Sequence, residues 1–492
     1  MIMRANSLPY VVDRNTEIVI FEQLLQSKKA EFVAVYGRRR IGKTYLINHC
    51  FQNRGLYFEV TGSKKASLQQ QLFHFHSEFT ALFSDAHYLA CPTDWSEAFN
   101  RLKDQIEQIE QIQPTQKIII FLDELPWLAT ARSEFLPALE YYWNRHFSRM
   151  PNLILIVCGS AASWMLNKIV NNKEGLYGRL SYSLPMQPFL LATTEKFLIS
   201  QNILLPRKQV VEIFMVTGGV AKYLTYFERG KSIAQSISAL FFMPHGQLFL
   251  EFQRLFQSLF DSSEKHIALI RALSKKRYGL KQADLIALAG LTQNGKVTEV
   301  LSELEASGFI LITHEFGKQK RERKIRLIDE YTYFYLIWVE PNSSSIINNT
   351  NIDYWQQQQH SSAWQAWVGY AFENICLKHI KSIKRALGIA GVNTTESHWS
   401  HQSEAGGAEI DLVIERADNV IHLCEIKFSD SEYTITKNYA EKLQHKIDLF
   451  RQVTRTRKAL CLTMITPYGV KMNPYYTQVV TQQLTLEDLF DG

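Results

Sequence analysis

A short run near the N-terminus has the residue types and spacing needed to bind phosphate. It fits the pattern G-x-x-x-x-G-K-[ST] with the residues Gly37, Arg38, Arg39, Arg40, Ile41, Gly42, Lys43 and Thr44. The glycines let the backbone curl until its N–H groups point at phosphate oxygens, and a following helix N-terminus adds a favourable dipole. Lys43 would then reach the β- and γ-phosphates, and the Thr44 hydroxyl would hold Mg²⁺. The run predicts a site for ATP and Mg²⁺.

A second pair of candidate catalytic residues follows a long apolar stretch. Residues 118–122 are apolar and lead directly into Asp123 and Glu124. A parallel strand buried on both faces reads as such a run, and ligands bind at the carboxyl ends of strands in open α/β sheets. We therefore expect Asp123 to hold Mg²⁺, through water or through Thr44, and Glu124 to polarise the water that attacks the γ-phosphate.

Two further polar residues follow in the same half of the chain. Ser160 ends the apolar run 153–159, where it could contact the γ-phosphate or the attacking water, or instead cap a helix that begins near Ala161 or Ala162. Arg179 follows the pair Gly175 and Gly178. It could stabilise transition-state charge, in cis or from a neighbouring subunit, or simply form a surface salt bridge.

A pair of carboxylates in the C-terminal part of the chain is predicted to meet across a hairpin. Residues 408–415 and 420–428 read as two strands around a tight turn. Centring the hairpin on Asp418 places Asp411 opposite Glu425. Directly opposed side chains have Cβ atoms about 5 Å apart, and like charges there are destabilising. A divalent cation between the two carboxylates would remove the repulsion.

This hairpin could perform metal-dependent hydrolysis. We expect Asp411 and Glu425 to share one Mg²⁺ or Mn²⁺, with the Ile426 carbonyl as a third protein ligand. Lys427 lies two residues beyond Glu425 on the same face, where it could orient a water molecule or stabilise negative charge. The alternative is an exposed hairpin with a solvated polar face.

The phosphate-binding run needs a parallel sheet to position it. Residues 32–36 and 153–160 read as buried strands, as do residues 56–60, whereas residues 64–112 are mostly helical in pattern. Residues 45–48 read as the first turn of a helix, so the glycine-rich run joins a strand to a helix. The pattern predicts an α/β domain.

Composition bounds the remaining possibilities. The chain has 492 residues and a net charge of +6, which permits an acidic partner without demanding one. Its six cysteines are scattered, so disulfide or metal-finger frameworks are not expected and a reducing compartment fits. Neither an apolar run long enough to span a membrane nor a signal-peptide core is present in the sequence, so we expect a cytoplasmic protein with no membrane partner.

Residues 251–341 predict a winged helix, in which three helices precede two strands. The strands would be residues 308–312 and 324–328, joined by a strongly basic tip at 317–324. This tip could contact DNA phosphates. Alternatively, the hairpin is solvated in a domain that only packs against the ATPase.

The N-terminal motifs together resemble the archaeal-type ATPases of the AAA+/STAND class. The resemblance rests on the phosphate-binding run at 37–44 and on the runs at 121–124, 158–160, 177–179 and 217–224. It implies an ASCE-type P-loop core at 1–190, a helical lid at 191–250 and the winged helix at 251–341. Ala221 departs from the family pattern T-G-G-x-P-x-Y, in which proline is usual at this position.

The C-terminal hairpin resembles the PD-(D/E)xK nuclease fold over about residues 360 to 492. Asp411 and the run Glu425-Ile426-Lys427 match its motif, and the resemblance implies that Glu373 is the helix carboxylate. Many archaeal-type ATPases carry such a domain. Residues 342–359 are polar and are the expected linker. The overall expectation is an α/β multidomain chain with a nuclease-like domain at 360–492.

Two functions follow from these patterns. One is an ATP-hydrolysing protein that acts on DNA through a Mg²⁺-dependent nuclease domain. Such a protein could form a homo-oligomer. The other is a nucleotide-dependent regulator or signalling scaffold whose nuclease-like domain binds without cutting.

Overall fold

The chain folds into two compact units. The computed structural model describes residues 11–83, 88–130, 132–171, 176, 178–276, 278–318, 323–348, 354–359, 361–403 and 406–491. The first unit comprises Met1–Pro188 and Gln257–Asp261, and the second comprises Phe189–Phe256 and Ser262–Gly492.

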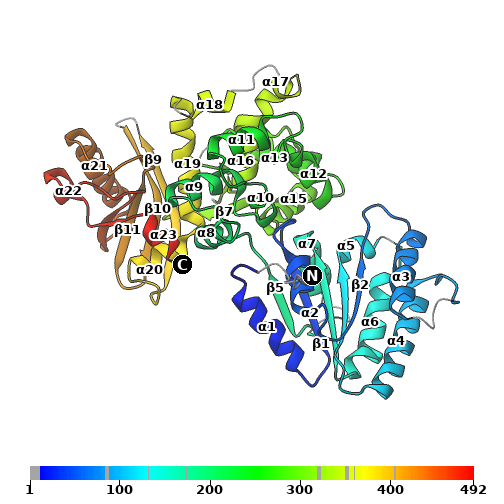
Figure 1. The fold of residues 1–492 in the computed structure, drawn as a ribbon. Coiled ribbons are helices and arrows are strands. Elements are labelled where there is room, and N and C mark those ends of the chain that lie inside the picture. Colours follow the sequence, from blue (N-terminus) through cyan, green and yellow to red (C-terminus); the bar gives the residue numbers. More distant parts are fainter. Residues whose placement is uncertain are drawn as a thin grey trace, which may run out of the picture. The chain divides into compact units, whose positions relative to one another are not determined.

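The first unit is built on a parallel sheet of five strands (Figure 1). The strands are β1 (Glu31–Tyr36), β2 (Leu56–Thr61), β3 (Ile118–Asp123), β4 (Leu153–Gly159) and β5 (Tyr182–Pro185). Their order is β2-β3-β4-β1-β5, so β4 lies between the strand that precedes the glycine-rich run and the strand that ends in Asp123. The apolar runs noted in the sequence are these buried strands.

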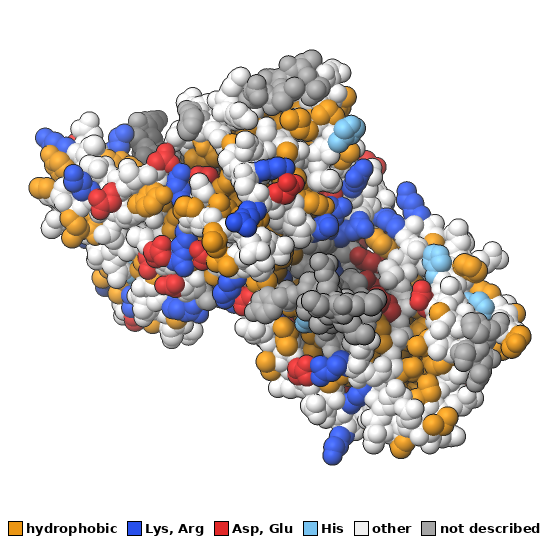
Figure 2. Space-filling view, in the orientation of Figure 1, with side chains coloured by type: hydrophobic (Ala, Val, Ile, Leu, Met, Phe, Trp, Pro, Cys, Tyr) orange, Lys and Arg blue, Asp and Glu red, His pale blue; other side chains and the backbone are white. Residues whose placement is uncertain are grey.

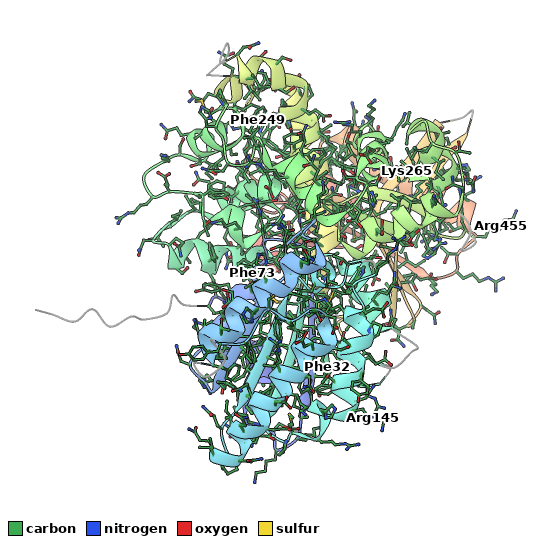
Figure 3. All side chains as sticks on the ribbon, turned by 90° about the vertical axis from the view of Figure 1, so that its right-hand side faces the viewer. Phe32, Phe73, Arg145, Phe249, Lys265 and Arg455 are labelled. Atoms are coloured by element: carbon green, nitrogen blue, oxygen red, sulfur yellow. The ribbon has the colours of Figure 1, made fainter. Side chains whose placement is uncertain are left out.

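Helices cover both faces of this sheet because its central strands are apolar on both sides. The helices are α1 (Asn15–Gln26), α2 (Lys43–Phe51), α3 (Leu68–Leu82), α4 (Trp95–Ile112), α5 (Leu125–Leu128), α6 (Phe135–Arg145) and α7 (Ala162–Met165). Phe21 of α1 and Leu46 of α2 pack with Val33 and its neighbours on one face. Phe32 points to the other face, where its ring centroid lies 4.8 Å from that of Trp143 on α6 (Figure 3).

The second unit begins with helices. They are α8 (Leu191–Ser200), α9 (Arg207–Thr217), α10 (Ala221–Leu224), α11 (Ile233–Phe241), α12 (Glu251–Leu259, whose last residues belong to the first unit), α13 (Glu264–Ser274), α14 (Gln282–Leu288), α15 (Gly295–Ala306) and α16 (Glu330–Phe334). A small sheet accompanies α13 to α15. It consists of β6 (Leu280–Lys281), β7 (Ile310–His314) and β8 (Arg323–Leu327) in the order β6-β8-β7.

The β7–β8 hairpin packs against the C-terminal sheet of the same unit. Glu315 forms an isolated bridge with His398, and the Phe316 N–H donates a 2.9 Å hydrogen bond to the His398 carbonyl. The rings of Phe316 and Phe450 lie 5.0 Å apart. We did not predict this contact from the sequence, from which we expected the hairpin to be solvated or to contact DNA.

Residues 342–359 differ from the expected linker. Their described part holds α17 (Ser343–Ile347) and α18 (Tyr354–Gln358). Trp355 is fully buried and packs against Phe334 and Trp364 at centroid distances of 5.1 Å each. One large aromatic side chain therefore anchors a stretch whose polar composition suggested exposure.

The C-terminal part of the second unit is a mixed sheet of five strands. These are β9 (Thr394–Ser403), β10 (Gly406–Arg416), β11 (Val420–Ile426), β12 (Ala459–Ile465) and β13 (Gln482–Leu484), in the order β13-β12-β11-β10-β9. Strands β9, β10 and β11 are antiparallel neighbours, whereas β11, β12 and β13 run parallel. The accompanying helices are α19 (Ser362–Lys378), α20 (Ile380–Ala386), α21 (Lys437–Thr454), α22 (Pro474–Val479) and α23 (Leu486–Phe490).

Basic side chains are interspersed with other groups on the face of the molecule seen in Figure 2. On the face seen in Figure 2, Lys and Arg side chains are mixed with Asp and Glu and with apolar groups.

None of the described helices combines the length and the apolar character needed to cross a bilayer.

Candidate functional site

The glycine-rich run forms a tight loop between β1 and α2, as the sequence predicts. Gly37 has φ 144° and Gly42 has φ 93°, in the region that favours glycine. A Cβ atom on Gly37 would lie 2.2 Å from the carbonyl oxygen of Met186, so no larger residue fits there. Gly42 is the N-cap of α2, which leaves the first N–H groups of the helix directed at the loop.

Lys43 lies folded within this loop. Its Nζ atom donates hydrogen bonds of 2.9 Å to the carbonyl oxygens of both Gly37 and Arg38, and the side chain is buried. Of the intervening residues, Ile41 is buried in the core and the Arg39 guanidinium lies 5.5 Å from the centroid of the Trp127 ring. The ammonium group of Lys43 is thus held at the centre of the loop, where a bound phosphate would replace the carbonyl partners.

Thr44 and Asp123 meet at the carboxyl edge of the sheet. The Thr44 hydroxyl donates a 2.8 Å hydrogen bond to Oδ2 of Asp123, and Oδ1 of Asp123 accepts from the Glu124 N–H at 2.9 Å. A hydroxyl and a buried carboxylate are hard oxygen donors of the kind that Mg²⁺ prefers, so these residues fit that ion. The predicted convergence of Thr44 and Asp123 is therefore present in the structure.

Glu124 and Ser160 form a pair that the sequence did not predict. Glu124 adopts the left-handed conformation with φ 47° immediately after β3. Its Oε2 atom accepts hydrogen bonds from the Ser160 hydroxyl at 2.8 Å and from the Ser160 N–H at 3.1 Å. Ser160 does not cap α7, because that helix begins at Ala162 with Ala161 as an N-cap that makes no side-chain bond. The capping alternative was wrong, since the hydroxyl is used by Glu124.

Arg179 is exposed in the first unit. It follows Gly178, which has φ 67°, and its own N–H donates to the Leu176 carbonyl at 3.2 Å. Gly175 and Tyr177 of the predicted motif lie outside the described residues. An exposed guanidinium agrees with a role toward a neighbouring subunit as well as with a surface ion pair, so both alternatives stay open.

The hairpin register in the C-terminal sheet agrees with the sequence prediction. Leu412 pairs with Cys424 and Glu415 with Ile421, which continues to Asp411 opposite Glu425. The register between β9 and β10 shifts between Ile410 and Val413, which places a β-bulge at Asp411. Bulges re-aim side chains and are common next to active sites.

The Asp411 side chain is only 7% exposed and lies among other charged groups. Its Oδ2 atom accepts a 2.9 Å hydrogen bond from the Ile426 N–H, and Nζ of Lys427 lies 4.0 Å from the same oxygen. Burial, followed by the negative charges of Glu425 and Glu373, raises the pKa of Asp411 to about 7. A group shifted in this way, beside a second carboxylate and a lysine, marks a candidate functional site.

Glu425 is surrounded by cationic and hydroxyl groups. Nζ of Lys427 lies 2.7 Å from Oε1, Nζ of Lys446 lies 2.7 Å from Oε2, and the Tyr439 hydroxyl donates to Oε1 at 3.0 Å. Burial alone would raise the pKa of Glu425, but Lys427 and Lys446 outweigh it and lower that pKa. The two lysines thus favour the ionised form of Glu425, whereas burial and the neighbouring carboxylates disfavour the ionised form of Asp411.

Glu373 lies close to this cluster, as the resemblance implied. It is buried on α19, and its Oε2 atom pairs with Nη2 of Arg326 from β8 at 3.1 Å. The Arg326 guanidinium also lies 4.5 Å from the centroid of the Tyr370 ring. Within the described residues, no group of three or more His, Cys, Asp or Glu side chains could hold a metal ion. Two carboxylates and a main-chain carbonyl remain a donor set that suits Mg²⁺ or Mn²⁺, with water completing the shell.

Sequence reasoning missed three members of the cluster, which are Tyr439, Lys446 and Arg326. Tyr439 and Lys446 are seven residues apart on α21 and share one helix face. That spacing could have predicted that Tyr439 and Lys446 lie on the same side of a helix, but nothing in the sequence indicated that this side packs against Glu425. Arg326 comes from the small sheet, so only the tertiary fold brings it to Glu373.

Two families match this chain. Residues 11–227 match an ATPase domain described as predominantly from Archaea. Residues 335–442 match a family described as archaeal and bacterial proteins of unknown function. The first match contains the glycine-rich loop, Asp123, Glu124 and Ser160, and the second contains Asp411 and Glu425.

Individual proteins resemble most of the chain. An uncharacterized protein of Methanocaldococcus jannaschii is 24% identical over 461 residues, which cover 89% of this chain and 92% of that protein. The Walker-type ATPase of Pyrococcus abyssi is 18% identical with a TM-score of 0.50, over 66% of this chain and 96% of that one. The ORC2 protein of Aeropyrum pernix is 13% identical with a TM-score of 0.43, over 73% of this chain and 98% of that one. The P-loop geometry and the family match lead to one conclusion: residues 11–227 form a P-loop ATPase domain similar to this predominantly archaeal family, and residues 335–442 are similar to the second family.

Proposed function

We propose that this chain couples ATP hydrolysis to metal-dependent cleavage of DNA by its C-terminal sheet. The observation that carries the nuclease part is the convergence of Asp411, Glu425 and Lys427, with both lysine–carboxylate distances at 4.0 Å or less. The ATPase part rests on the loop at 37–44 and on Glu124.

The residues of the P-loop site divide the work of hydrolysis. The N–H groups of residues 38–44 and the Lys43 ammonium bind the phosphates, while Thr44 and Asp123 would hold Mg²⁺, which neutralises charge on the phosphates. Glu124 accepts a proton from the attacking water through the carboxylate oxygen that Ser160 does not occupy. Ser160 keeps that carboxylate in place from the end of the neighbouring strand.

The C-terminal cluster supports phosphodiester hydrolysis. Asp411 and Glu425 would hold a divalent cation, which acts as a Lewis acid on the phosphate. Lys427 lies beside the carboxylates and not on the metal, because an ammonium group has no lone pair to donate. It would orient the attacking water or stabilise the negative charge that develops on the phosphate.

The alternative is a regulator whose nuclease-like domain binds without cutting. One observation favours it: both oxygens of Glu425 are already engaged, by Lys427, Lys446 and Tyr439. A divalent cation would have to displace at least one of these partners.

DNA is the proposed partner, through the predicted winged helix at residues 251–341. Lys318 pairs with Glu315 at 3.0 Å and Arg323 is exposed, whereas Lys320 and Arg321 lie outside the described residues. Replacing Lys318, Lys320, Arg321 and Arg323 by Ala should weaken DNA binding uniformly across sequences. The log–log salt slope should fall by about one unit for each lost phosphate contact. An unchanged slope would indicate that the hairpin only packs against β9 and does not contact DNA phosphates.

Plasmid cleavage with Mg²⁺ or Mn²⁺, with and without ATP, tests the proposal directly. Asp411→Ala should abolish cleavage and keep ATPase activity, whereas Lys43→Ala should lose ATP binding and any ATP dependence of cleavage. Asp418→Ala is the matched control, because Asp418 is exposed in the turn of the same hairpin. Wild-type protein that hydrolyses ATP yet leaves every DNA form intact would favour the binding-only alternative.

A further inference from the structure

A cavity lies beside the carboxylate cluster, between the β7–β8 hairpin and strands β9 and β10. Its volume is about 270 Å³. The residues that line it include Ile312 on β7, Arg326 on β8 and Asp411 on β10. All of these elements belong to the second unit, and Asp411 is shared between the cavity wall and the carboxylate pair.

Three residues that line the cavity each have a buried polar atom with no hydrogen-bond partner within the part of the chain that the structure describes. These atoms are Nε of Arg326, Oγ of Ser397 and Nε2 of His398. The Arg326 and Ser397 side chains belong to residues only 6% and 7% exposed. Almost all buried polar groups in folded proteins are paired, because an unpaired one has lost its water without compensation. Ser397 and His398 are consecutive on β9, so their side chains point to opposite faces of the strand, and Ser397 shares the face of Trp399. Nε of Arg326 and Nε2 of His398 are therefore the unpaired polar atoms that indicate a polar ligand in the cavity.

The other charged groups of the wall are already satisfied. Glu396 pairs with Lys384 and accepts from the Thr394 hydroxyl at 2.6 Å, and Asp411 accepts from the Ile426 N–H. The remaining wall combines apolar and polar residues. The apolar ones are Leu311, Ile312, Leu377, Ile380, Ile410 and Leu412, and the polar ones are Tyr278, Thr313, His314 and Glu409. The site therefore suits a neutral group with apolar faces and a hydrogen-bonding edge.

The volume of the cavity limits the size of the ligand that it can hold. Its volume is just below the range of about 300–1,000 Å³ that is usual for small-molecule pockets. At about 30 Å³ for each water molecule, it would hold roughly nine waters. A single heterocyclic base fits this size.

We propose that the cavity binds one unpaired nucleobase of a nucleic-acid strand whose phosphate lies at Asp411 and Glu425. This inference rests on the proposed nuclease function and names its substrate as a single-stranded or locally unpaired region. Arg326 and His398 would bind the edge of the base, and the apolar side chains would contact its faces. Proteins that act on nucleic acids commonly hold extruded bases in this way.

Binding without metal tests the inference independently of cleavage. The probes are two fluorescein-labelled single-stranded DNAs of equal length, one with all its bases and one fully abasic, so that their charges match. With the full chain in EDTA, fluorescence anisotropy should show at least about tenfold tighter binding of the base-bearing strand. Equal affinities for the two strands would overturn the inference.

Variants locate the preference in the cavity. Ile312→Trp should fill it and remove the preference, whereas Thr395→Trp on the exposed side of β9 should keep it. His398→Leu should also remove the preference without lowering the thermal midpoint, because it deletes an unpaired buried polar atom. A preference that survives both Ile312→Trp and His398→Leu would place the base elsewhere and overturn the inference.

Cleavage separates this inference from the function on which it rests. A base preference in a protein that never cuts DNA would support the cavity and refute the nuclease. Metal-dependent cutting of DNA with no base preference would support the nuclease and refute the cavity.

Discussion

The Ser160 hydroxyl and the Ser160 N–H both donate to Oε2 of Glu124, at 2.8 and 3.1 Å. Ser160 follows β4 and Glu124 follows β3, and these strands are neighbours in the sheet. The two hydrogen bonds fix the carboxylate by one oxygen and leave Oε1 available to a water molecule. Because Ser160 comes from a different strand, a shift of β4 relative to β3 would move the carboxylate that we propose as the catalytic base.

This pairing predicts graded effects at the two positions. Glu124→Gln should retain ATP binding and lose hydrolysis, because the amide cannot accept the proton of the attacking water. Ser160→Ala removes one hydrogen bond to a charged group, worth about 1.5–3 kcal/mol, but keeps the N–H. We expect its kcat to fall by about tenfold or more with nearly unchanged ATP affinity. Steady-state ATPase assays and calorimetry measure both, and normal hydrolysis by Glu124→Gln would assign the base elsewhere.

Lys43→Ala should abolish ATP binding. In the structure the Lys43 ammonium group donates hydrogen bonds to the carbonyl oxygens of Gly37 and Arg38. The loop therefore holds a positive charge next to the position expected for the phosphate oxygens. Removing the charge deprives the β- and γ-phosphates of their main cationic partner. Calorimetric titration with ATP checks this, and an unchanged affinity would contradict the phosphate-loop assignment.

Much of the ATPase fold follows from local sequence. A parallel strand buried on both faces must be continuously apolar, so the runs ending at Tyr36, Asp123 and Gly159 identified β1, β3 and β4. The hairpin register was also predictable, since a side-chain period of two allows few alignments once the turn is known. The structure confirms it at the pair Leu412 and Cys424.

The remaining features depend on tertiary packing. Trp355 lies in a polar stretch, and only its aromatic neighbours make it part of a core. Lys446 reaches Glu425 because α21 packs over the sheet, which its own amphipathic pattern does not specify. The partner of Ser160 depends on the order of β3 and β4 in the sheet, and that order cannot be read from either strand.

Arg179 provides a test for an active site shared between subunits. If this exposed arginine acts in trans, mixing Arg179→Ala with Lys43→Ala subunits should restore some ATPase activity. In such a mixture, one interface would combine an intact loop with an intact arginine. Activity is measured across mixing ratios, with mixed oligomers verified by mass. No restoration at any ratio would argue against a trans arginine and favour a surface ion pair.

His379 predicts a stability change in mild acid. Its Nε2 atom accepts a 3.0 Å hydrogen bond from the Leu191 N–H at the start of α8, and Nδ1 lies 2.7 Å from the Ile375 carbonyl. Burial lowers the pKa of His379 to about 4. The unfolded state therefore binds more protons between about pH 6.5 and 4, so stability should fall as the pH decreases through that window.

A variant isolates this contribution. The lowered pKa corresponds to roughly 3 kcal/mol, lost progressively below pH 6.5. His379→Gln cannot gain a proton, so its unfolding free energy should vary less with pH over the same window, although its stability at neutral pH is lower. Urea denaturation between pH 4 and 7 compares the two proteins. Parallel pH profiles would show that other groups dominate.

The two lysines at Glu425 allow a matched comparison in the C-terminal cluster. Lys427 and Lys446 each lie 2.7 Å from one oxygen of the same carboxylate, on β11's continuation and on α21 respectively. Only Lys427 also approaches Asp411, at 4.0 Å. If Lys427 takes part in the reaction and Lys446 only neutralises charge, the two substitutions should have opposite effects on DNA cleavage.

Lys427→Ala should keep metal binding, which the loss of a competing cation at Glu425 also favours, and lose cleavage. Lys446→Ala should keep cleavage and bind Mg²⁺ more tightly, because one cation that competes for Glu425 is gone. Two unit charges 4 Å apart interact by about 1 kcal/mol even in bulk water, so the gain should be at least about fivefold. Calorimetry with Mg²⁺ and plasmid cleavage measure both properties, and Asp411→Ala should lose both. Equal loss of cleavage in the two lysine variants would mean that both ammonium groups stabilise the reaction, whereas unchanged metal affinity in Lys446→Ala would place the cation away from Glu425.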